Sequence, residues 1–564
     1  MNGNTEAASL SGQRTTAPIG SGYDYIVIGS GAGGMPAAAR LAESGKKVLL
    51  IERGSVSTYR FGGRRRPAWL EDTNLTRYDV PGLYNVIWHN HDGIRNADVG
   101  PITGRLLGGG PAINAGLWFR PQAADWDGIG NPEGWRAADM AGATERAFAR
   151  VPWTERPAVD GVLHNTKVHE LVTKGLAAKG WRAVVANDEP EAKQRTFAHA
   201  AHFFMDGERG GPLRTYLGEA ADKHAGGNLE IWTDTTVTRL ERRGDTVTGV
   251  QVDAVGEAGH SGVVKVGDGG RVILSAGVFG TAKILFRSGI GPRDQLEVVA
   301  GVEGGEMTPP SQWIELPVGQ ELDDHVNTAI AFEHPDIVHY DFDAAFDNPP
   351  RADAEKYLSG RSGILAQASP NINPVFWESI KGADGITRHF QWTSYTLGPQ
   401  SGSGNNSAAL HAGLGLGKTS RGRVTIDSSL NMGVGTMPYF NDEGNHDLEA
   451  VIETVAHVVE AVSAIPGVKM LEPAPGQDVR EYVESIPVTI ARTANHWVGT
   501  TRLGTDSGLE GGRAVVDVNA QVYGTRNLHV VDASIVNGIQ TANPQAGIII
   551  AAEKAIERIL GLDN

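Results

Sequence analysis

The residues best placed to do chemistry near the start of the chain are three glycines and a glutamate. Gly29, Gly31 and Gly34 have the GxGxxG spacing within residues 23–54, YDYIVIGSGAGGMPAAARLAESGKKVLLIERG. The first glycine permits a tight turn, the second lets the backbone approach a pyrophosphate, and the third lets a helix pack on its strand. Glu52 ends the next apolar run, where a carboxylate can hydrogen-bond an adenosine ribose. The sequence therefore predicts a dinucleotide-binding strand–helix–strand unit.

A second glycine cluster follows in GRLLGGGPAINAGLWFR, residues 104–120. Gly108 and Gly109 have no side chains, so a planar ring system can lie against their backbone. Asn114 offers both a hydrogen-bond donor and an acceptor at the same surface. We interpret the cluster as part of a cofactor surface; the alternative is a glycine-rich turn before a helix.

Composition limits the partners and the chemistry. The chain has 564 residues, which suggests two domains, and its formal net charge of −16 argues against nucleic acid or an anionic membrane as the main partner. Cysteine is absent, which excludes disulfides, thiolate catalysis and cysteine-held metal sites, and we expect no metal at the site. Residues 1–22 are small and polar, without an apolar signal-peptide core. We expect them to be a disordered leader and the protein to be cytoplasmic.

The pattern of elements changes twice along the chain. Helix and strand patterns alternate in the first third, as a parallel α/β sheet requires. Residues 229–253 predict strands joined by a turn at 243–245, and RVILSAG at 271–277 predicts a buried strand before a helix. Between about 313 and 490, Pro-Pro pairs, loops and scattered aromatics suit a sheet that covers a substrate cavity. The α/β style then returns and ends in a helix at PQAGIIIAAEKAIERIL, which predicts one domain interrupted by another.

Five motifs in order resemble those of the glucose–methanol–choline (GMC) family of FAD oxidoreductases. They are GSGAGG with Glu52, GGGPAIN, ERGGPLRTYL at 208–217, GRVILSAGVFGTAKILFRSGIGP at 270–292, and NHWVGTTRLG through VVDASIVNGIQTANPQAG at 495–547. The resemblance runs from Tyr23 to Leu560. Within the family, the chain is most similar to the flavodehydrogenase domain of cellobiose dehydrogenase, through the 271–292 motif, QWIELPVG at 312–319, and the pairing of NHW with NPQ.

The resemblance implies an α/β fold in which a Rossmann-like FAD-binding domain is interleaved with an α+β substrate domain. The FAD-binding domain would comprise residues 23–126, 200–312 and 491–564, and the substrate-binding domain 127–199 and 313–490. FAD would be held noncovalently, because the position at which some members attach the flavin to a histidine is Ile113 here. The implied cofactor-binding residues are Gly29, Gly31, Gly34, Glu52, Arg53, Gly108, Gly109, Asn114, Ala115, Val237, Asp532, Ala533, Asn543, Pro544 and Gln545.

Two residues near the C-terminus match the catalytic positions of the family. His496 matches the base, and a neutral imidazole can take a hydroxyl proton near neutral pH. Asn543 matches the second position, where an amide can hold the substrate oxygen but does not act as a base. The alternative for Asn543 is that it N-caps a helix whose first residue is Pro544.

The substrate contacts are predicted from the same likeness. Asn495, Trp497 and Tyr395 are the candidates for substrate binding, and Trp118, Phe119 and Trp392 could add to an aromatic cavity or pack in the core. Arg492 and Ala494 replace residues of the cellobiose enzymes just before the Asn–His pair, which suggests an altered sugar subsite.

These residues predict FAD-dependent oxidation of an alcohol, with a sugar or glycoside hydroxyl as the leading substrate. A small-molecule alcohol or carbohydrate and an electron acceptor are the expected partners. We expect no fused haem domain, so a quinone, a redox protein or O2 would take the electrons, and a dehydrogenase is favoured over an oxidase. The alternatives are oxidation of an aryl or alkyl alcohol, a lyase of the hydroxynitrile type in which FAD is not reduced, and a noncatalytic flavin-binding protein.

Overall fold

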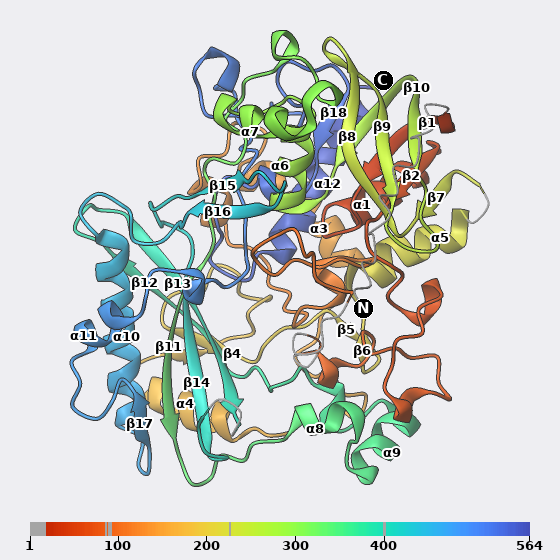
Figure 1. Ribbon diagram of the computed structural model, residues 1–564. Coiled ribbons are helices and arrows are strands. Elements are labelled where there is room, and N and C mark those ends of the chain that lie inside the picture. Colours follow the sequence, from red (N-terminus) through yellow and green to blue (C-terminus); the bar gives the residue numbers. More distant parts are fainter. Residues whose placement is uncertain (1–17, 85–86, 88–92, 225–226, 399–401, 564) are drawn as a thin grey trace, which may run out of the picture.

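The computed structural model describes residues 18–84, 87, 93–224, 227–398 and 402–563 (Figure 1). It opens with strand β1 (Pro18–Ile28), helix α1 (Gly34–Glu43) and strand β2 (Val48–Ile51). All four residues of β2 are buried, as expected for an inner strand of a parallel sheet. The predicted strand–helix–strand unit is therefore confirmed.

The start of β1 corrects the predicted leader. Residues 18–22 are not disordered, because Pro18 and Gly20 pair with Val263 and Val264 of a neighbouring strand. Backbone pairing with the neighbouring strand orders this segment. Residues 1–17 of the predicted leader lie outside the described residues.

The first sheet contains the nucleotide unit. Its strands run in the order β7-β2-β1-β10-β9-β8, and β18 also pairs with β10. Strand β10 runs parallel to β1 from its first residues to its last. Its first residues also pair antiparallel with β9, and its last residues pair parallel with β18. The predicted turn between strands near residue 244 is confirmed. The bounds of the added strands are β7 (Leu229–Trp232), β8 (Thr235–Arg243), β9 (Thr246–Ala254), β10 (Gly262–Leu274) and β18 (Leu528–Val530).

Helices from both ends of the chain pack beside this sheet. The final helix α12 (Gln545–Gly561) packs against α1 and against α3 (Ala137–Arg150). Helix α6 (Gly277–Arg287) follows β10 and packs on β8 and on α7 (Arg293–Glu303). The predicted helices after RVILSAG and at the C-terminus are thus present, so the last part of the chain returns to the first sheet.

The second sheet lies apart from the first in Figure 1. Its order is β17-β11-β14-β13-β12-β4-β3, and the neighbouring strands are antiparallel except β3 and β4. Helix α10 (His446–Ser463) packs on one face of the sheet, where Trp392 donates to Thr454 of α10 at 3.2 Å. The strand bounds are β3 (Arg182–Ala183), β4 (Thr196–Ala198), β11 (Val326–Glu333), β12 (Val375–Lys381), β13 (Thr387–Leu397), β14 (Ser407–Leu414) and β17 (Lys469–Glu472).

Because side chains alternate along a strand, β13 presents different residues to its two faces. Trp392 is fully buried beneath α10, whereas Gln391, Thr393 and Tyr395 point to the opposite face and line a cavity. The predicted class, a parallel α/β unit interrupted by a sheet that covers a cavity, is confirmed. The division of the connecting segments between two domains stays a prediction. Within the described part of the chain, no helix is both long and apolar enough to cross a membrane.

Candidate active site

A cavity of about 850 Å³ brings the predicted site residues together. The glycine turn after β1 lines one part of it, and the inner face of β13 lines another. The loops that carry His496 and Asn543 line it as well. A single cavity therefore joins the nucleotide unit to the predicted catalytic pair.

The glycines of the first turn meet different constraints. A Cβ atom on Gly29 would lie 2.4 Å from the carbonyl oxygen of Ser275, and one on Gly34 would lie 1.9 Å from that of Gly29 itself. Gly33, which the motif does not single out, would place a Cβ 1.9 Å from the carbonyl oxygen of Val531. Gly31 differs, because a Cβ there would have no atom within 4 Å and would project into open space. This open backbone fits the close approach of a pyrophosphate.

The second glycine loop packs directly against the first. A Cβ on Gly109 would lie 2.9 Å from the Cα atom of Gly31, and the backbone N–H of Gly108 donates to the Ser30 hydroxyl at 3.0 Å. Gly109 lines the cavity, whereas Gly108 does not. Gly108 therefore contributes to loop contact rather than to the cavity surface.

Glu52 lines the cavity, and hydrogen bonds from neighbouring residues fix its carboxylate. Its carboxylate accepts from the N–H of Ser30 at 3.0 Å, the Ser30 hydroxyl at 2.6 Å and the N–H of Gly54 at 2.7 Å. Burial raises the pKa of Glu52 above its usual value. The neighbouring Arg53 also lines the cavity and forms an ion pair with Asp98 at 2.7 Å. Glu52 thus fixes the glycine turn in addition to lining the cavity.

Most of the other predicted cofactor residues lie on the same cavity. Asp532 accepts from the N–H of Gly277 at 2.9 Å and the hydroxyl of Thr281 at 2.6 Å, which fixes it at the first turn of α6. Asn114 donates to the side chain of Gln545, the first residue of α12. The remaining residues of this set that line the cavity are Ala115, Val237, Ala533, Asn543 and Pro544.

The predicted catalytic residues are in direct contact. Asn543 Nδ2 lies 3.0 Å from His496 Nε2. The backbone N–H of Asn543 donates to Gln391 Oε1 at 3.1 Å, and Gln391 Nε2 in turn donates to Asn543 Oδ1. Because a backbone N–H is always a donor, this pair of bonds fixes both amides and leaves Asn543 Nδ2 to donate to His496. The alternative that Asn543 caps α12 is wrong, since the residue before the helix is Pro544 and no side chain caps it.

The ring of His496 is fixed from both sides. Its Nε2 accepts from Asn543, so the neutral ring has its proton on Nδ1, which lies 2.9 Å from His325 Nδ1. Burial and the nearby His325 hold the pKa of His496 well below its usual value. Burial lowers the pKa of His325 to about 4. His496 is therefore neutral at neutral pH, and its unprotonated nitrogen is the one beside Asn543.

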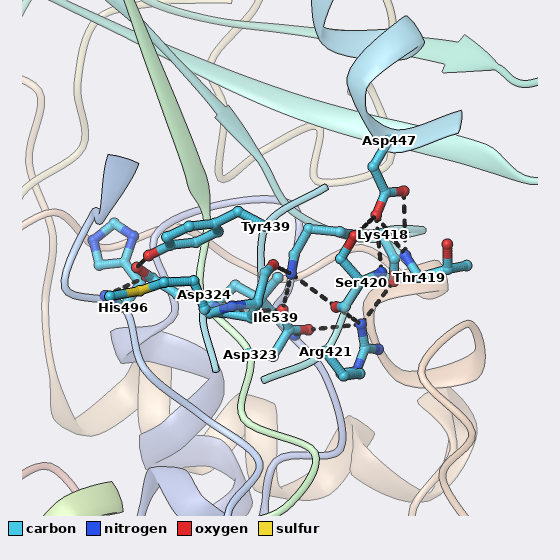
Figure 2. Close-up of polar contacts among 12 residues, drawn as sticks. Asp323, Asp324, Lys418, Thr419, Ser420, Arg421, Tyr439, Asp447, His496 and Ile539 are labelled. Carbon is cyan, nitrogen blue, oxygen red and sulfur yellow. Dashed lines mark hydrogen bonds and ion pairs between the residues drawn. The ribbon is translucent and has the colours of Figure 1, made fainter. Parts of the chain in front are cut away.

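Asp324 holds the loop that carries His496 (Figure 2). Its carboxylate accepts from the N–H of His496 at 2.7 Å and the N–H of Ala494 at 3.1 Å. It also accepts from the hydroxyls of Thr493 and Tyr439, each at 2.7 Å. Burial raises the pKa of Asp324 to about 6. Four donors on one buried carboxylate leave this loop little freedom.

Asp323 holds the loop that leads to Asn543. It accepts from the N–H of Ile539 at 3.0 Å and forms an ion pair with Lys418 at 2.5 Å (Figure 2). Arg421 lies 3.4 Å from the same carboxylate. Asp323, Asp324 and His325 precede β11 directly, so one short segment contacts both catalytic loops.

Sequence reasoning missed these supporting residues. Three consecutive ionisable residues, Asp323 to His325, stand before the apolar alternation of β11, and all three are buried. That pattern is a detectable signal, because buried ionisable groups need partners. Gln391 gives no such signal, since it is one polar residue in an alternating strand.

The predicted substrate residues all line the cavity. They are Asn495, Trp497 and Tyr395. Asn495 has a left-handed backbone with φ of 56°, and its Oδ1 accepts from Trp497 Nε1 at 3.3 Å.

Three aromatic residues, for which the sequence left cavity lining and core packing open, pack in the hydrophobic core. Trp118, Phe119 and Trp392 are buried there and do not line the cavity. Arg492 points away from it and donates to the Thr328 hydroxyl at 2.9 Å and to the carbonyl of Val483 at 2.6 Å. The arginine at this position, where the cellobiose enzymes have another residue, therefore does not directly change the cavity surface.

Comparison with protein families identifies the fold. The GMC oxidoreductase family matches residues 23–327 with its N-terminal part and residues 418–552 with its C-terminal part. This chain belongs to the GMC oxidoreductase family. Its two-sheet architecture is the GMC fold, with a Rossmann-like FAD-binding domain and a substrate domain.

Individual relatives cover almost the whole chain. The oxygen-dependent choline dehydrogenase of Proteus mirabilis is 28% identical over 572 residues, 96% of each chain. The chloroplastic fatty acid photodecarboxylase of Chlamydomonas reinhardtii is 26% identical over 98% of this chain and 93% of its own length. A crystal structure of formate oxidase superimposes with a TM-score of 0.73 at 20% identity, over 97% of this chain and 99% of that one. The likeness to cellobiose dehydrogenase stays a prediction.

Family membership makes FAD the cofactor of this GMC protein. The residues present fit it, since the open backbone at Gly31 and the N-terminus of α12 both lie on the cavity.

The glycine turn generates a first prediction. Gly33→Ala should destabilise the fold by roughly 1–3 kcal/mol or more, because its methyl group would overlap the Val531 carbonyl. Gly31→Ala should fold and retain less FAD, because its methyl group would enter the cavity. Thermal unfolding and the ratio of flavin to protein absorbance measure the two effects. Gly305→Ala, which has open space around it outside this cavity, is the matched control. Wild-type melting of Gly33→Ala would contradict the packing argument.

A second prediction concerns Asp324. Asp324→Asn replaces one carboxylate oxygen with an NH2 group, which cannot accept a hydrogen bond. One or more of the N–H and hydroxyl donors of Asp324 then loses its acceptor, so the loop of His496 should shift. A displacement of about 1 Å at the reacting groups can cost about 100-fold in rate. Anaerobic flavin reduction should slow to that extent while FAD stays bound. The exposed Asp268→Asn serves as the control, and an unchanged rate in Asp324→Asn would show that this carboxylate does not position the loop.

Proposed function

We propose that this GMC protein is an alcohol oxidoreductase in which His496 is the base and Asn543 orients the substrate. One observation supports this most strongly. His496 Nε2 and Asn543 Nδ2 lie 3.0 Å apart on the cavity that also contains the glycine turn. One hydroxyl oxygen can lie within hydrogen-bond distance of both atoms. It then replaces the hydrogen bond between them, because it donates its proton to His496 Nε2 and accepts from Asn543 Nδ2.

The roles of the two side chains follow from their protonation. His496 Nε2 is unprotonated and takes the hydroxyl proton, while Asn543 Nδ2 donates to the oxygen as negative charge develops. Asn495 contributes a further polar contact at the cavity wall. Bound FAD, held without a covalent bond because Ile113 occupies the position of the attaching histidine, supplies the acceptor for the hydride.

The leading substrate class is a sugar or glycoside hydroxyl. The electrons pass from the flavin to a quinone, a redox protein or O2, and we favour a dehydrogenase over an oxidase. The polar inner face of the second sheet supports a hydroxyl-rich substrate. An aryl or alkyl alcohol is the second candidate, because Leu117, Pro370 and Ile372 give the cavity an apolar wall.

The rate of anaerobic flavin reduction by sugars, glycosides and aryl alcohols tests both substrate classes. The rate of flavin reoxidation by O2 or benzoquinone tests the electron acceptor. A lyase would leave the flavin oxidised.

The role of His496 leads to a third prediction. His496→Ala should lower the rate of flavin reduction by roughly 10²- to 10⁴-fold, because the proton acceptor is lost. Stopped-flow absorbance at the flavin band measures the rate, and FAD content confirms that the variant is loaded. His224→Ala, at the end of helix α5 (Glu219–His224), is the control. Reduction at the wild-type rate in His496→Ala would remove this residue from its proposed role.

The pKa of His496 gives a fourth prediction. The base must be neutral to act, and protonation at low pH removes it. Burial lowers its pKa, so the rate should stay constant as the pH falls through about 6.5, where an ordinary histidine is half protonated. It should decline only at more acidic pH, where protonation of Asp324, whose pKa is about 6, also weakens the support of the His496 loop. The pH profile of anaerobic flavin reduction measures this, and an acidic limb centred at or above about 6.5 would contradict it.

A further inference from the structure

One face of the second sheet leads away from the catalytic pair. Gln391 contacts Asn543 at one end, and Tyr395 stands four residues further along β13, with its Cα about 14 Å away at ~3.4 Å per residue. Across the sheet, Thr393 pairs with His411 of β14, and Gln391 pairs with Gly413, which in turn pairs with Asn327 of β11. A substrate that reaches Tyr395 therefore extends well beyond the carbon being oxidised.

Three side chains on this face form a directed chain of hydrogen bonds. His411 Nδ1 lies 3.1 Å from Asn327 Oδ1, and His411 Nε2 bonds the hydroxyl of Tyr395. Asn327 Oδ1 only accepts, so the ring proton lies on Nδ1 and His411 Nε2 accepts from Tyr395. Burial lowers the pKa of His411 to about 4 and raises the pKa of Tyr395, so the ring stays neutral and the phenol keeps its proton. The Tyr395 oxygen is left free to accept but not to donate.

Charge is distributed unevenly around the cavity. Among the described lining residues, every Asp, Glu, Lys and Arg belongs to the first sheet, its helices or the connecting loops, and none to the strands of the second sheet. Those side chains already have partners in the chain; Asp98, for example, pairs with both Arg53 and Lys283. A charged substrate group placed against the second sheet would find no counter-charge there, and burying an unpaired charge is costly.

We infer that the cavity accepts an uncharged alcohol with a second hydroxyl group remote from the carbon that is oxidised, and that this hydroxyl donates to the oxygen of Tyr395. His411 and Asn327 set the direction of that bond. Pro370, whose carbonyl accepts from the N–H of Thr396 beside Tyr395, gives the spacer between the two hydroxyls an apolar contact. The inference rests on the proposed alcohol oxidation and defines the substrate class for it.

The test uses three matched series of linear probes of increasing length: diols, ω-methoxy alcohols and plain n-alkanols. All have the same reacting group, but only the diols present a donor at the far end. Anaerobic flavin reduction by the FAD-loaded protein gives kcat/KM for each probe. One neutral hydrogen bond should favour a diol over its methoxy partner by about 3- to 10-fold at the length that spans the cavity. Choline and a linear ω-hydroxy acid should be poorer substrates than the diol of similar size.

Two variants test the assignment of the bond. Tyr395→Phe should abolish the diol-to-methoxy preference, whereas Tyr340→Phe, whose hydroxyl bonds Asp353 outside the cavity, should keep it. His411→Phe removes the acceptor of the Tyr395 hydroxyl, which can then donate to a methoxy oxygen. The kcat/KM of the methoxy alcohols should therefore rise relative to that of the diols. Bound FAD and thermal unfolding check that each variant is folded.

The outcomes separate this inference from the proposed function. Equal rates for diols and methoxy alcohols at every length, or an unchanged preference in Tyr395→Phe, would overturn the inference and leave alcohol oxidation standing. A flavin that no alcohol, sugar or glycoside reduces would overturn the proposed function, and the inference with it.

Discussion

The active-site geometry depends on two adjacent buried carboxylates at the start of β11. Asp324 holds the loop of His496, and Asp323 holds the loop that leads to Asn543. These loops come from different parts of the chain, and bonds to this common segment help to hold their side chains 3.0 Å apart. The contact between His496 and Asn543 therefore depends on the segment before β11 as well as on the two residues themselves.

Two neighbouring carboxylates in the interior would repel each other without compensation. Lys418, which is itself buried, neutralises Asp323, while Asp324 is satisfied by hydrogen bonds alone. Burial raises the pKa of Asp324, which has no cation in contact among the described residues. The extent of this network, which continues from Lys418 to Ser420 and Asp447 (Figure 2), shows how far the support for the active site reaches.

The cavity has two chemically different sides because two different sheets build it. The first sheet and its loops supply close backbone approach at Gly31 and paired charges such as Arg53 and Asp98. The second sheet supplies neutral polar groups at the spacing of one strand face. Relatives of this GMC protein share the fold and have names that imply different substrates. The substrate of this chain therefore has to be argued from the side chains that line its own cavity and not from the fold.

The sequence by itself determined the local units. Glycine spacing, apolar runs and a terminal acid specify the β1–α1–β2 unit and the helix α12, because these depend on neighbouring residues. The sequence also supplied His496 and Asn543 through their motifs. It did not supply Asp324, which contacts His496 across 172 residues, nor Gln391, which contacts Asn543 across 152. It left open, for the same reason, whether Trp118, Phe119 and Trp392 line the cavity or pack in the core. Which face of a strand meets a cavity, and which loops share a carboxylate, are decided only when the two sheets pack together.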